Sequence, residues 1–499
     1  MNIQTARLAQ GKNVSIAILL SATTIGTFIG SLDASIVYIS LDKMQSDFGV
    51  ASQAQIEWVV LGYLLAVISL LEISGYLGDI FSNKLIFRIG MAIFGIGSLS
   101  CALAPSLPLL IVFRIFQGAG AAGLTGNTNA LITRFTTTRN RGTALGISAL
   151  IFASAMSIGP VLGGVLVEYL GWRSIFWINV PICAVGLIWT YFAIPPTPTL
   201  HKGKKKMDFG GAIFFSVFVT LLIFGLSFVI NENISRGKLI GGISLIVSAC
   251  VLLFFLFWEK KVENPLIDLS LFKNKKIALG LSAAVFAFQG INIVTYQVPF
   301  FLQDIKHFSP DMAGLILTGF PLAIVVTSPI AGKLSNHIDA KYLSSAGILG
   351  ISISLGLICL VLSSTLKIWV IIIISIFMGV SVGFFTAPNT NSVMSAGPKP
   401  KLGIVTGMVN LSRNIGFTLG TALSTLIFVF LLNRYQISTG LDKLNPAVYV
   451  PSMRIMIAVF AVFALIGATI SFLRGPEKRD EHNNIEQNSS SDNNKDLNK

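Results

Sequence analysis

Long apolar runs constrain the fold of this chain more than any other feature. About 20 consecutive apolar residues are enough to cross the hydrocarbon core of a bilayer as a helix. The sequence holds fourteen such runs, at 14–40, 54–74, 85–104, 107–133, 143–167, 174–194, 209–230, 239–258, 277–302, 311–332, 342–364, 368–391, 403–432 and 452–473. Only 12% of the 499 residues are charged and 53% are hydrophobic, too little charge to cover a soluble protein. The sequence predicts an all-α polytopic membrane protein with fourteen transmembrane helices.

Neither an enzyme nor a metal or cofactor site is predicted. Cys101, Cys183, Cys250 and Cys359 fall within predicted spans and form no C-x-x-C or Cys/His pattern, so we expect them to pack as small apolar side chains. The sequence contains no G-x-x-x-x-G-K-[ST] phosphate loop, so direct drive by ATP is not expected. It also lacks Ser/His, H-E-x-x-H and paired intramembrane Asp constellations, which argues against an intramembrane enzyme.

The positive charge of the chain alternates in density from one loop to the next. The formal net charge is +14. With the N-terminus placed inside, the even-numbered loops and both tails hold 25 Lys and Arg residues, and the odd-numbered loops hold 9. This bias follows the positive-inside rule and predicts a multi-pass protein of the cell membrane with both termini in the cytoplasm. Topology and contact with anionic lipid therefore explain the charge better than nucleic acid does.

An internal repeat divides the chain into two halves. Residues 257 positions apart match in two separated regions, as in the pairs Gly75 and Gly332, Lys84 and Lys341, Gly90 and Gly347, and Gly159 and Gly416. The offset maps the second run onto the tenth and the fifth onto the thirteenth, so six spans repeat and two are inserted between them. The predicted parts are a cytoplasmic segment 1–13, a six-helix bundle 14–194, a basic linker with two inserted helices 195–276, a second six-helix bundle 277–474, and a disordered cytoplasmic tail 475–499.

Three motifs give the chain a resemblance to a known family. They are LDASIVYISL at 32–41, RIFQGAGAA at 114–122 and GPVLGG at 159–164. With these motifs and its two parallel six-span halves, the chain resembles the major facilitator superfamily, and within it the fourteen-span drug:proton antiporters of the EmrB/QacA type. The resemblance implies the major facilitator fold, with two six-helix bundles plus two inserted helices. It also implies a monomer that moves a small molecule and protons across the lipid bilayer by alternating access.

The loop after the second run departs from the family pattern G-x-L-A-D-R-x-G-R-K. The chain keeps this gating pattern at Gly75, Asp79 and Lys84, and the repeat echoes it at Gly332 and Lys341. The Arg, Gly and Arg of the pattern are replaced by Ile80, Ser82 and Asn83. We therefore expect a thinner network of charges at this gating loop than in a typical family member.

Asp33 lies in the first run, where an ionised carboxylate costs about 2.5–3.5 kcal/mol at mid-bilayer. A water-filled cavity, a paired cation or a bound proton would offset that cost, and each is useful for transport. The alternative is a polar anchor between helices. Arg114 in the fourth run is the candidate coupling partner, and Gln117 is a cavity candidate on the same run, unless Arg114 lies close enough to the exterior to snorkel. The sequence leaves the distance between Asp33 and Arg114 open.

Three further acidic residues lie near span ends. Glu72, three residues before Gly75, is either a second titratable group or an interfacial acid that pairs with a loop cation. Glu57 and Glu168 lie at exterior span ends, where we expect solvated boundary positions.

Small residues form a ladder with a four-residue spacing in the fifth run. The ladder and its neighbours are Ala155, Gly159, Pro160, Gly163 and Gly164. Such a ladder lets two helices touch along their backbones, and the proline removes one backbone hydrogen bond and favours a bend. Packing alone accounts for the small residues, whereas the family resemblance implies that the seam closes the exterior side and favours export. The repeat predicts a matching seam at Gly416 and Gly420.

The second half offers polar cavity candidates that are mostly uncharged. They are Gln289, Asn292, Gln297, Asn389 and Asn410. Each can orient a ligand by hydrogen bonds or hold two helices together. Arg413 is an intramembrane cation and therefore a candidate functional residue.

These observations favour proton-driven export of a small amphipathic compound. Asp33 is the predicted proton or cation site and Arg114 the predicted coupling residue. Uptake or facilitated passage of a metabolite on the same scaffold is the alternative, because a fold settles neither direction nor substrate. A non-transporting receptor or scaffold is a more distant alternative, because the short loops leave little room for a partner-binding module.

Overall fold

The computed structural model describes residues 16–50, 53–136, 138–195, 208–229, 237–262, 265–335, 337–398, 402–439, 442 and 444–475. Within these ranges the chain forms helices and no β-strand, so the predicted all-α class is confirmed. Twelve of the described helical segments are long and apolar enough to cross a membrane. Their high mean hydropathy is typical of helices surrounded by lipid and by other helices.

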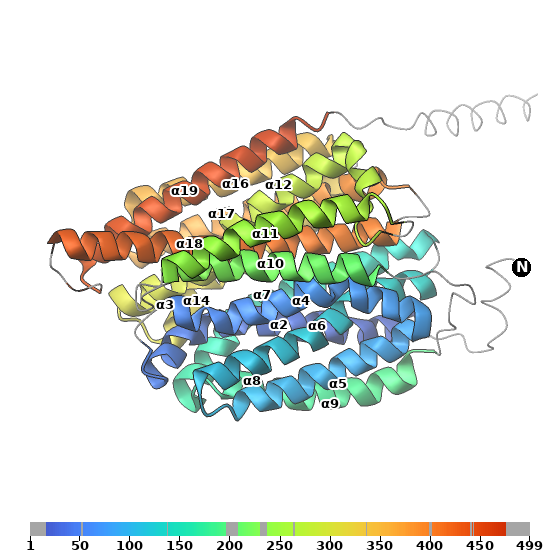
Figure 1. Cartoon of the computed structure of the whole chain (residues 1–499), viewed down its shortest axis with the longest axis horizontal. Helices are drawn as coiled ribbons and strands as arrows, with labels where there is room; N and C mark the ends of the chain where they lie inside the picture. Colours follow the sequence, from blue (N-terminus) through green and yellow to red (C-terminus); the bar gives the residue numbers. More distant parts are fainter. Residues whose placement is uncertain are drawn as a thin grey trace, which may run out of the picture.

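The first half occupies the lower part of Figure 1, in blue and cyan. Its elements are α2 (Ile16–Asp47), α3 (Gln53–Ile56), α4 (Trp58–Leu77), η1 (Gly78–Ser82), α5 (Asn83–Ala102), α6 (Leu107–Phe135), α7 (Thr138–Leu170), α8 (Ser174–Trp177) and α9 (Asn179–Ala193). We call the end of the bundle at which α2 begins the terminal end, and the opposite end the far end.

The two helices α4 and α5 follow one another closely and run in opposite directions. Ser82 at their junction is extended, with φ 179° and ψ 127°, and its hydroxyl caps the start of α5. Both helices pack on α6, and the residues of α6 that each one contacts show the direction in which it runs. Gly118 of α6 lies against Tyr63 near the start of α4, whereas Gln117 lies against Gly97 near the end of α5. The start of α4 and the end of α5 therefore lie at the same end of the bundle, so the two helices are antiparallel.

The second half occupies the upper part of Figure 1, in yellow to red. Its elements, after the short helix η2 (Leu269–Lys273), are α12 (Lys275–Asn292), η3 (Ile293–Gln297), α13 (Val298–Phe300), η4 (Phe301–Ile305), α14 (Pro310–Leu317), α15 (Gly319–Leu334), α16 (Ala340–Val361), α17 (Ile368–Ser395), α18 (Leu402–Thr439) and α19 (Pro446–Phe472). The elements η3 and η4 are turns of π-helix.

The inserted helices α10 (Phe209–Val229) and α11 (Gly237–Glu259) pack on each other and lie in green across the junction of the halves in Figure 1. α10 contacts α4 of the first half and α18 of the second. A buried apolar cluster that includes Leu61, Ile223 and Leu411 joins these three helices. The inserted pair therefore covers one junction between the halves.

Each half has an apolar core, and the two cores interlock. Ile39 of α2 belongs to the cluster of the second half. Tyr296 of η3 and Phe300 of α13 belong to the cluster of the first half. A change in the position of α2 therefore acts directly on both cores.

The two halves pack their helices in equivalent pairs. α7 packs on α2, and its counterpart α18 packs on α12. A Cβ atom added to Gly159 would meet Ser35 of α2, and one added to Gly420 would meet Asn292 of α12. Ser35 and Asn292 are themselves 257 positions apart. The seam predicted at Gly416 and Gly420 is thus a close contact between α18, which carries both glycines, and α12.

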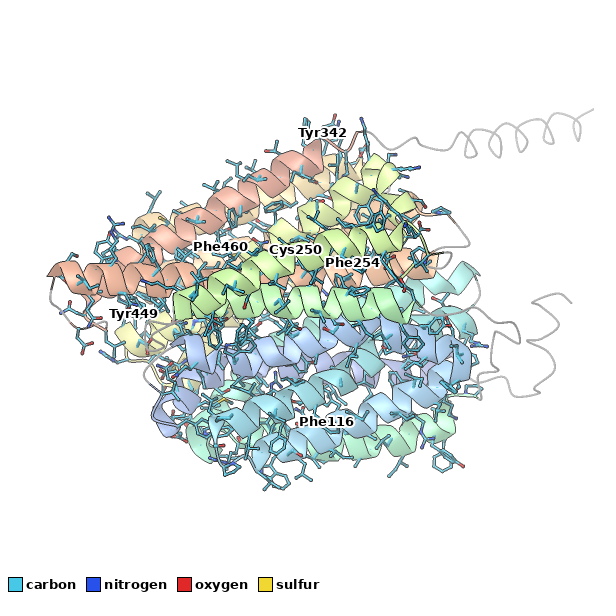
Figure 2. All side chains as sticks on the ribbon, in the orientation of Figure 1. Phe116, Cys250, Phe254, Tyr342, Tyr449 and Phe460 are labelled. Atoms are coloured by element: carbon cyan, nitrogen blue, oxygen red, sulfur yellow. The ribbon has the colours of Figure 1, made fainter. Side chains whose placement is uncertain are left out.

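The outer surface of the bundle is apolar. Large exposed hydrophobic side chains are spread over both halves and the inserted pair, including Phe116 of α6 and Phe254 of α11 (Figure 2). Phe460 of α19, in contrast, is buried in the core of the second half. A surface with this much exposed apolar area is stable in lipid rather than in water.

Candidate functional site

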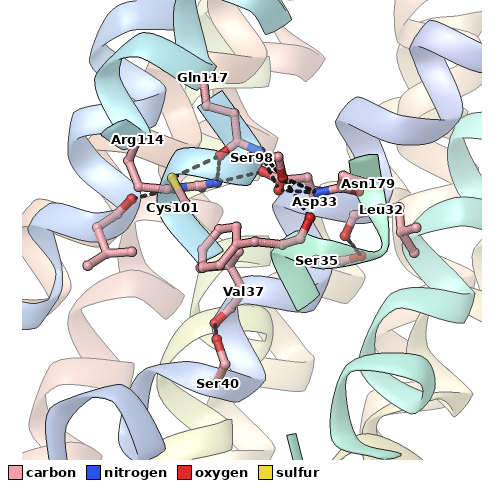
Figure 3. A network of polar contacts seen from close by, with 12 residues as sticks. Leu32, Asp33, Ser35, Val37, Ser40, Ser98, Cys101, Arg114, Gln117 and Asn179 are labelled. Atoms are coloured by element: carbon pink, nitrogen blue, oxygen red, sulfur yellow. Dashed lines mark hydrogen bonds and ion pairs between the residues drawn. The ribbon is translucent and has the colours of Figure 1, made fainter. Parts of the chain in front are cut away.

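Asp33 and Arg114 form an ion pair inside the first half. The Arg114 Nη1 atom donates to the Asp33 Oδ2 atom over 2.7 Å, and the two side chains are 1% and 0% exposed. Figure 3 shows the pair within a network of polar side chains. Asp33 comes from α2 and Arg114 from α6, so the fold joins two residues that are 81 positions apart. Arg114 is therefore paired inside the bundle and does not snorkel to its surface.

Arg114 is held in place by three further contacts. Its Nε atom donates to the backbone carbonyl of Val59 over 2.9 Å, and its Nη1 atom also donates to the Oε1 atom of Gln117 over 2.7 Å. The guanidinium group lies over the ring of Tyr63, 4.3 Å from its centroid, where a cation–π attraction applies. Gln117 reaches it because residues three apart share a helix face. These contacts fix the orientation of the cation toward Asp33.

The second carboxylate oxygen of Asp33 accepts two amide hydrogen bonds. The Nε2 atom of Gln117 and the Nδ2 atom of Asn179 each lie 3.0 Å from Oδ1. Ser98 of α5 accepts from both amides, over 3.2 and 3.1 Å, and donates to the backbone carbonyl of Phe176. Every hydrogen bond at Asp33 is donated to it, which is the pattern that an ionised carboxylate requires.

Asn179 and Ser98 are site residues that sequence reasoning missed. The sequence contains a usable signal for Asn179, because a polar amide stands two residues before a proline in the apolar stretch WINVPI. Ser98 has no such signal, since buried serines are common in these helices and many donate to their own backbone, as Ser354 does. The four helices α2, α5, α6 and α9 each supply a side chain to the network, and α4 supplies a backbone carbonyl.

The Ser98 hydroxyl is expected to stabilise this network. Replacing Ser98 with Ala removes the acceptor of two buried amides, and an unsatisfied buried polar group costs about 1–3 kcal/mol. We expect a clear drop in the thermal unfolding midpoint of the purified protein. The matched control is Ser354→Ala, because Ser354 is equally buried but donates only to the carbonyl of Gly350 in its own helix. Equal shifts for the two variants would contradict this role of Ser98.

The helix that carries Asp33 also reaches the second half. Tyr38 lies five residues after Asp33 on α2. The Asn292 Nδ2 atom lies 3.5 Å from the Tyr38 hydroxyl, and the rings of Tyr38 and Tyr296 pack edge to face with centroids 5.8 Å apart. A displacement of α2 at Asp33 would therefore also move Tyr38 and change its contacts with Asn292 and Tyr296 of the second half.

The polar candidates of the second half do not gather around Asp33. Asn292 and Gln297 donate to Thr421 and Ser424, so they join α12 and η3 to α18. Asn389 donates to the backbone carbonyl of Gly280 and accepts from Arg474. The buried Oε1 atom of Gln289 has no hydrogen-bond partner within the described ranges. The contacts of Asn292, Gln297 and Asn389 fit the interhelical alternative.

Arg413 and Glu72 are not part of the network around Asp33 and Arg114. Arg413 has no carboxylate partner in the described part of the chain. It donates to Asn410 and lies over the ring of Phe152 of α7, 4.7 Å from the centroid. The Glu72 carboxylate lies against Gly407 of α18, and no hydrogen-bond donor among the described residues reaches its buried Oε1 atom. The loop cation expected for Glu72 is thus not found in the described ranges.

Glu57 contradicts the expectation of a solvated boundary position. It is 0% exposed, because α10 and α18 cover the start of α4, and it accepts a hydrogen bond from Ser227 of α10 over 3.0 Å. Glu168 of α7 is exposed, as expected.

Two neutral amide side chains, Asn83 and Asn127, form hydrogen bonds at the gating loop of the terminal end. Asn83, which replaces an Arg of the family pattern, is buried and donates to the Oδ1 atom of Asn127 over 3.1 Å. Arg134 of α6 donates to the Oδ1 atom of Asn83 over 3.1 Å, and the charge of Asp79 acts on Arg134. Lys84 donates to the backbone carbonyls at the end of α9. Among the described residues, amide hydrogen bonds therefore hold this loop against α6.

The other residues of the gating pattern make packing contacts. A Cβ atom on Gly75 would lie 3.7 Å from the carbonyl of Gly126, and one on Gly332 would lie 3.9 Å from Ala387. Lys341 lies over the rings of Tyr342 and Phe472 at the terminal end of the second half, with centroid distances of 4.7 and 4.9 Å.

The small residues of α7 form contacts with both halves at the far end. A Cβ atom on Gly163 would lie 2.6 Å from Ile36 of α2. One on Gly164 would lie 2.5 Å from the carbonyl oxygen of Pro310 at the start of α14. One on Gly314 of α14 would overlap the carbonyl of Pro160. The predicted seam therefore also joins the two halves, and it is closed at the far end.

Comparison with known proteins agrees with the fold. A family model described as Major Facilitator Superfamily matches residues 23–305 and 279–495. The chain belongs to the Major Facilitator Superfamily. The riboflavin transporter RibZ of Clostridioides difficile (strain 630) is 32% identical over 466 residues, covering 92% of the chain and 98% of RibZ. The multidrug resistance protein Stp of Mycobacterium tuberculosis (strain CDC 1551 / Oshkosh) is 30% identical over 407 residues, covering 81% of the chain and 74% of Stp.

Solved structures of the same fold agree with the superfamily assignment. The xylose transporter XylE from E. coli, in a partially occluded inward open conformation, superposes with a TM-score of 0.64 at 13% identity, covering 93% of the chain and 98% of XylE. At this identity the likeness shows the fold alone. As a member of the superfamily, the chain is a multi-pass membrane transporter of a small molecule.

Proposed function

We propose that this transporter exports a small amphipathic compound in exchange for protons, with Asp33 as the proton-coupling carboxyl. The observation that carries the proposal is the fully buried ion pair of Asp33 and Arg114. Taking two charges out of water is expensive even when they pair, so neutral hydrogen bonds would anchor helices at a lower cost. A role in which Asp33 changes its charge during transport accounts for the ionic pair.

The ion pair gives Asp33 a different proton affinity in different conformations. In the arrangement described, Asp33 accepts hydrogen bonds from three N–H groups, one of them on Arg114. When the halves rearrange and water or substrate reaches the pair, a proton binds Asp33 and replaces Arg114 as its partner. Because proton binding then favours one conformation over the other, it is coupled to the movement of the substrate.

The topology proposed is that of the fourteen-span drug:proton antiporters. The segment Gln53–Ala102 contains the antiparallel helices α4 and α5, and α7 includes the shorter apolar helix Ser154–Leu170. Counting α4, α5 and α7 as separate passes gives fourteen spans. The positive-inside bias of the loops then places the terminal end in the cytoplasm and the far end outside.

Protons supply enough energy for this function. One pH unit is worth about 1.4 kcal/mol per proton, and a potential of 100 mV is worth about 2.3 kcal/mol per charge. One or two coupled protons therefore sustain a substrate gradient of roughly tenfold to a few hundredfold.

Membrane vesicles test both the coupling and the direction. Everted vesicles that contain the protein and are acidified inside are given ethidium, riboflavin, a panel of antibiotics or organic acids. We expect at least one compound to accumulate in the lumen and to release protons from it as it enters. Vesicles without the protein, and vesicles whose pH gradient is collapsed with nigericin, are the controls. Transport that is insensitive to nigericin would contradict the proposal.

Uptake of a metabolite is the second candidate function. It is supported by the 32% identity with a riboflavin transporter over nearly the whole of both chains. Under this alternative, riboflavin accumulates in right-side-out vesicles and does not accumulate in everted ones.

A further inference from the structure

Glu57 is a second buried carboxyl, outside the network of Asp33. It immediately precedes α4 at the far end of the first half. Its side chain is 0% exposed and touches three parts of the molecule. It accepts from the Ser227 hydroxyl of the inserted helix α10 over 3.0 Å, and Thr425 of α18 in the second half lies against the same carboxyl. Glu57 therefore sits where both halves and the inserted pair meet.

One oxygen of Glu57 lacks the donor that a carboxylate needs. The Oε2 atom is buried, and no hydrogen-bond partner for it lies among the described residues. No cation in the described part of the chain lies within ion-pair distance of Glu57. Arg114 donates to the nearby carbonyl of Val59, but its ion pair is with Asp33. An ionised carboxylate in this position would carry the full cost of burial without a compensating charge. A proton on the carboxyl removes that cost.

The groups that face Glu57 are neutral. The phenol of Tyr296 in the π-helical turn η3 lies near enough to interact with Glu57, and its hydroxyl shares a hydrogen bond with Thr425 over 3.1 Å. α10 and α18 present the hydroxyls of Ser227 and Thr425. Beside them, Gln53 donates to Gln297 over 3.2 Å and so joins the two halves at the same level. The π-helical turn is a further sign of function, because such turns are frequent at functional sites.

We propose that Glu57 is a second proton-binding site of the transport cycle, which takes up a proton from the exterior when the far end opens and keeps it while the far end is closed. Separation of α4 from α18 would bring water to the carboxyl and let the proton enter from that side, and the proton would leave toward the cytoplasm when the terminal end opens. In the closed arrangement Asp33 is ionised and Glu57 is neutral, so the two carboxyls hold their protons in different steps. This inference rests on the proposed proton-coupled function and adds one proton to each cycle.

Infrared spectroscopy tests the protonation directly, without a substrate. The purified full-length protein in liposomes is expected to show a carbonyl band of a neutral carboxyl that is lost in Glu57→Gln. The glutamine mimics the neutral acid in size and charge, so the closed arrangement is retained. The matched controls are Glu168→Gln, an exposed carboxyl on α7, and Asp33→Asn, which removes an ionised carboxylate. A spectrum in which Glu57→Gln leaves this band unchanged would overturn the proposal.

The proton count per cycle is the second test. With the membrane potential held at zero, the substrate gradient at which net flux reverses is measured against the imposed pH difference, using the compound that gave proton release in the vesicle screen. For two protons, one pH unit balances about a 100-fold gradient; for one proton, it balances about a tenfold gradient. We expect the larger value for the natural protein, the smaller for Glu57→Gln, and no change for Glu168→Gln.

The outcomes separate the two proposals. A reversal gradient in the natural protein that does not depend on pH means that the proton-coupled function fails. A dependence on a single proton in the natural protein overturns the role of Glu57 and leaves the role of Asp33 intact. Equal reversal gradients for Glu57→Gln and the natural protein would likewise overturn the role of Glu57.

Discussion

Asp33→Asn is expected to abolish proton release driven by substrate. Asparagine cannot bind and release a proton, so the coupling step is lost, whereas its side chain keeps nearly the size and shape of aspartate. Substrate exchange across vesicles without a pH gradient is expected to persist, because that exchange does not require a proton to be moved. The measurement is substrate-induced proton flux and substrate counterflow in the same vesicles. Proton flux that is unchanged from the natural protein would exclude Asp33 as the coupling site.

Asp33→Asn also leaves the Arg114 cation without its anion. Removing one partner of a buried pair costs about 3–5 kcal/mol, and we expect the lower end of that range because the asparagine oxygen still accepts an N–H group. A lower thermal unfolding midpoint therefore accompanies the loss of flux. Asp33→Glu is the matched control, since it keeps the charge and the titratable group. We expect it to retain part of the proton flux, which would separate loss of chemistry from loss of packing.

Gly314→Val is expected to keep the far end from closing. Any Cβ atom at this position overlaps the carbonyl of Pro160 on α7, and a backbone group cannot turn aside as a side chain can. Overpacking of this kind typically costs about 1–3 kcal/mol. Since 1.4 kcal/mol is a factor of ten in an equilibrium, we expect the closed population to fall by roughly tenfold or more and transport to fall with it.

Spin labels at the far end measure that shift. Labels at Leu170 and Met312, both exposed near the seam, report the distance between α7 and α14, after replacement of the accessible Cys250. The distribution is expected to move to longer distances in Gly314→Val. Gly356→Ala is the control, because a Cβ atom at Gly356 meets nothing within 4 Å. An unchanged distance and normal transport in Gly314→Val would mean that this contact does not gate the far end.

Local patterns in the chain predicted its class, its repeat and its two principal charges. Apolar runs long enough to span a bilayer require helices, because lipid offers no partner for an open backbone. The offset of 257 residues predicted which helices are equivalent in the two halves, and the structure packs α7 on α2 in the first half and the equivalent α18 on α12 in the second. Asp33 and Arg114 were identifiable because a charge inside an apolar run is costly and needs a reason.

Only the tertiary structure decided which polar groups meet. Asn179 lies 146 residues from Asp33 and hydrogen-bonds to it, and no periodicity encodes that distance. Glu57 occupies a boundary position in its own run, yet it is buried by helices whose contact residue, Ser227, is 170 positions away. Spacing along a helix fixes only which face a residue shares, whereas burial and hydrogen bonding depend on the helices that pack against that face. For this reason the sequence identified the charged residues of the site, and only the packed bundle revealed their partners.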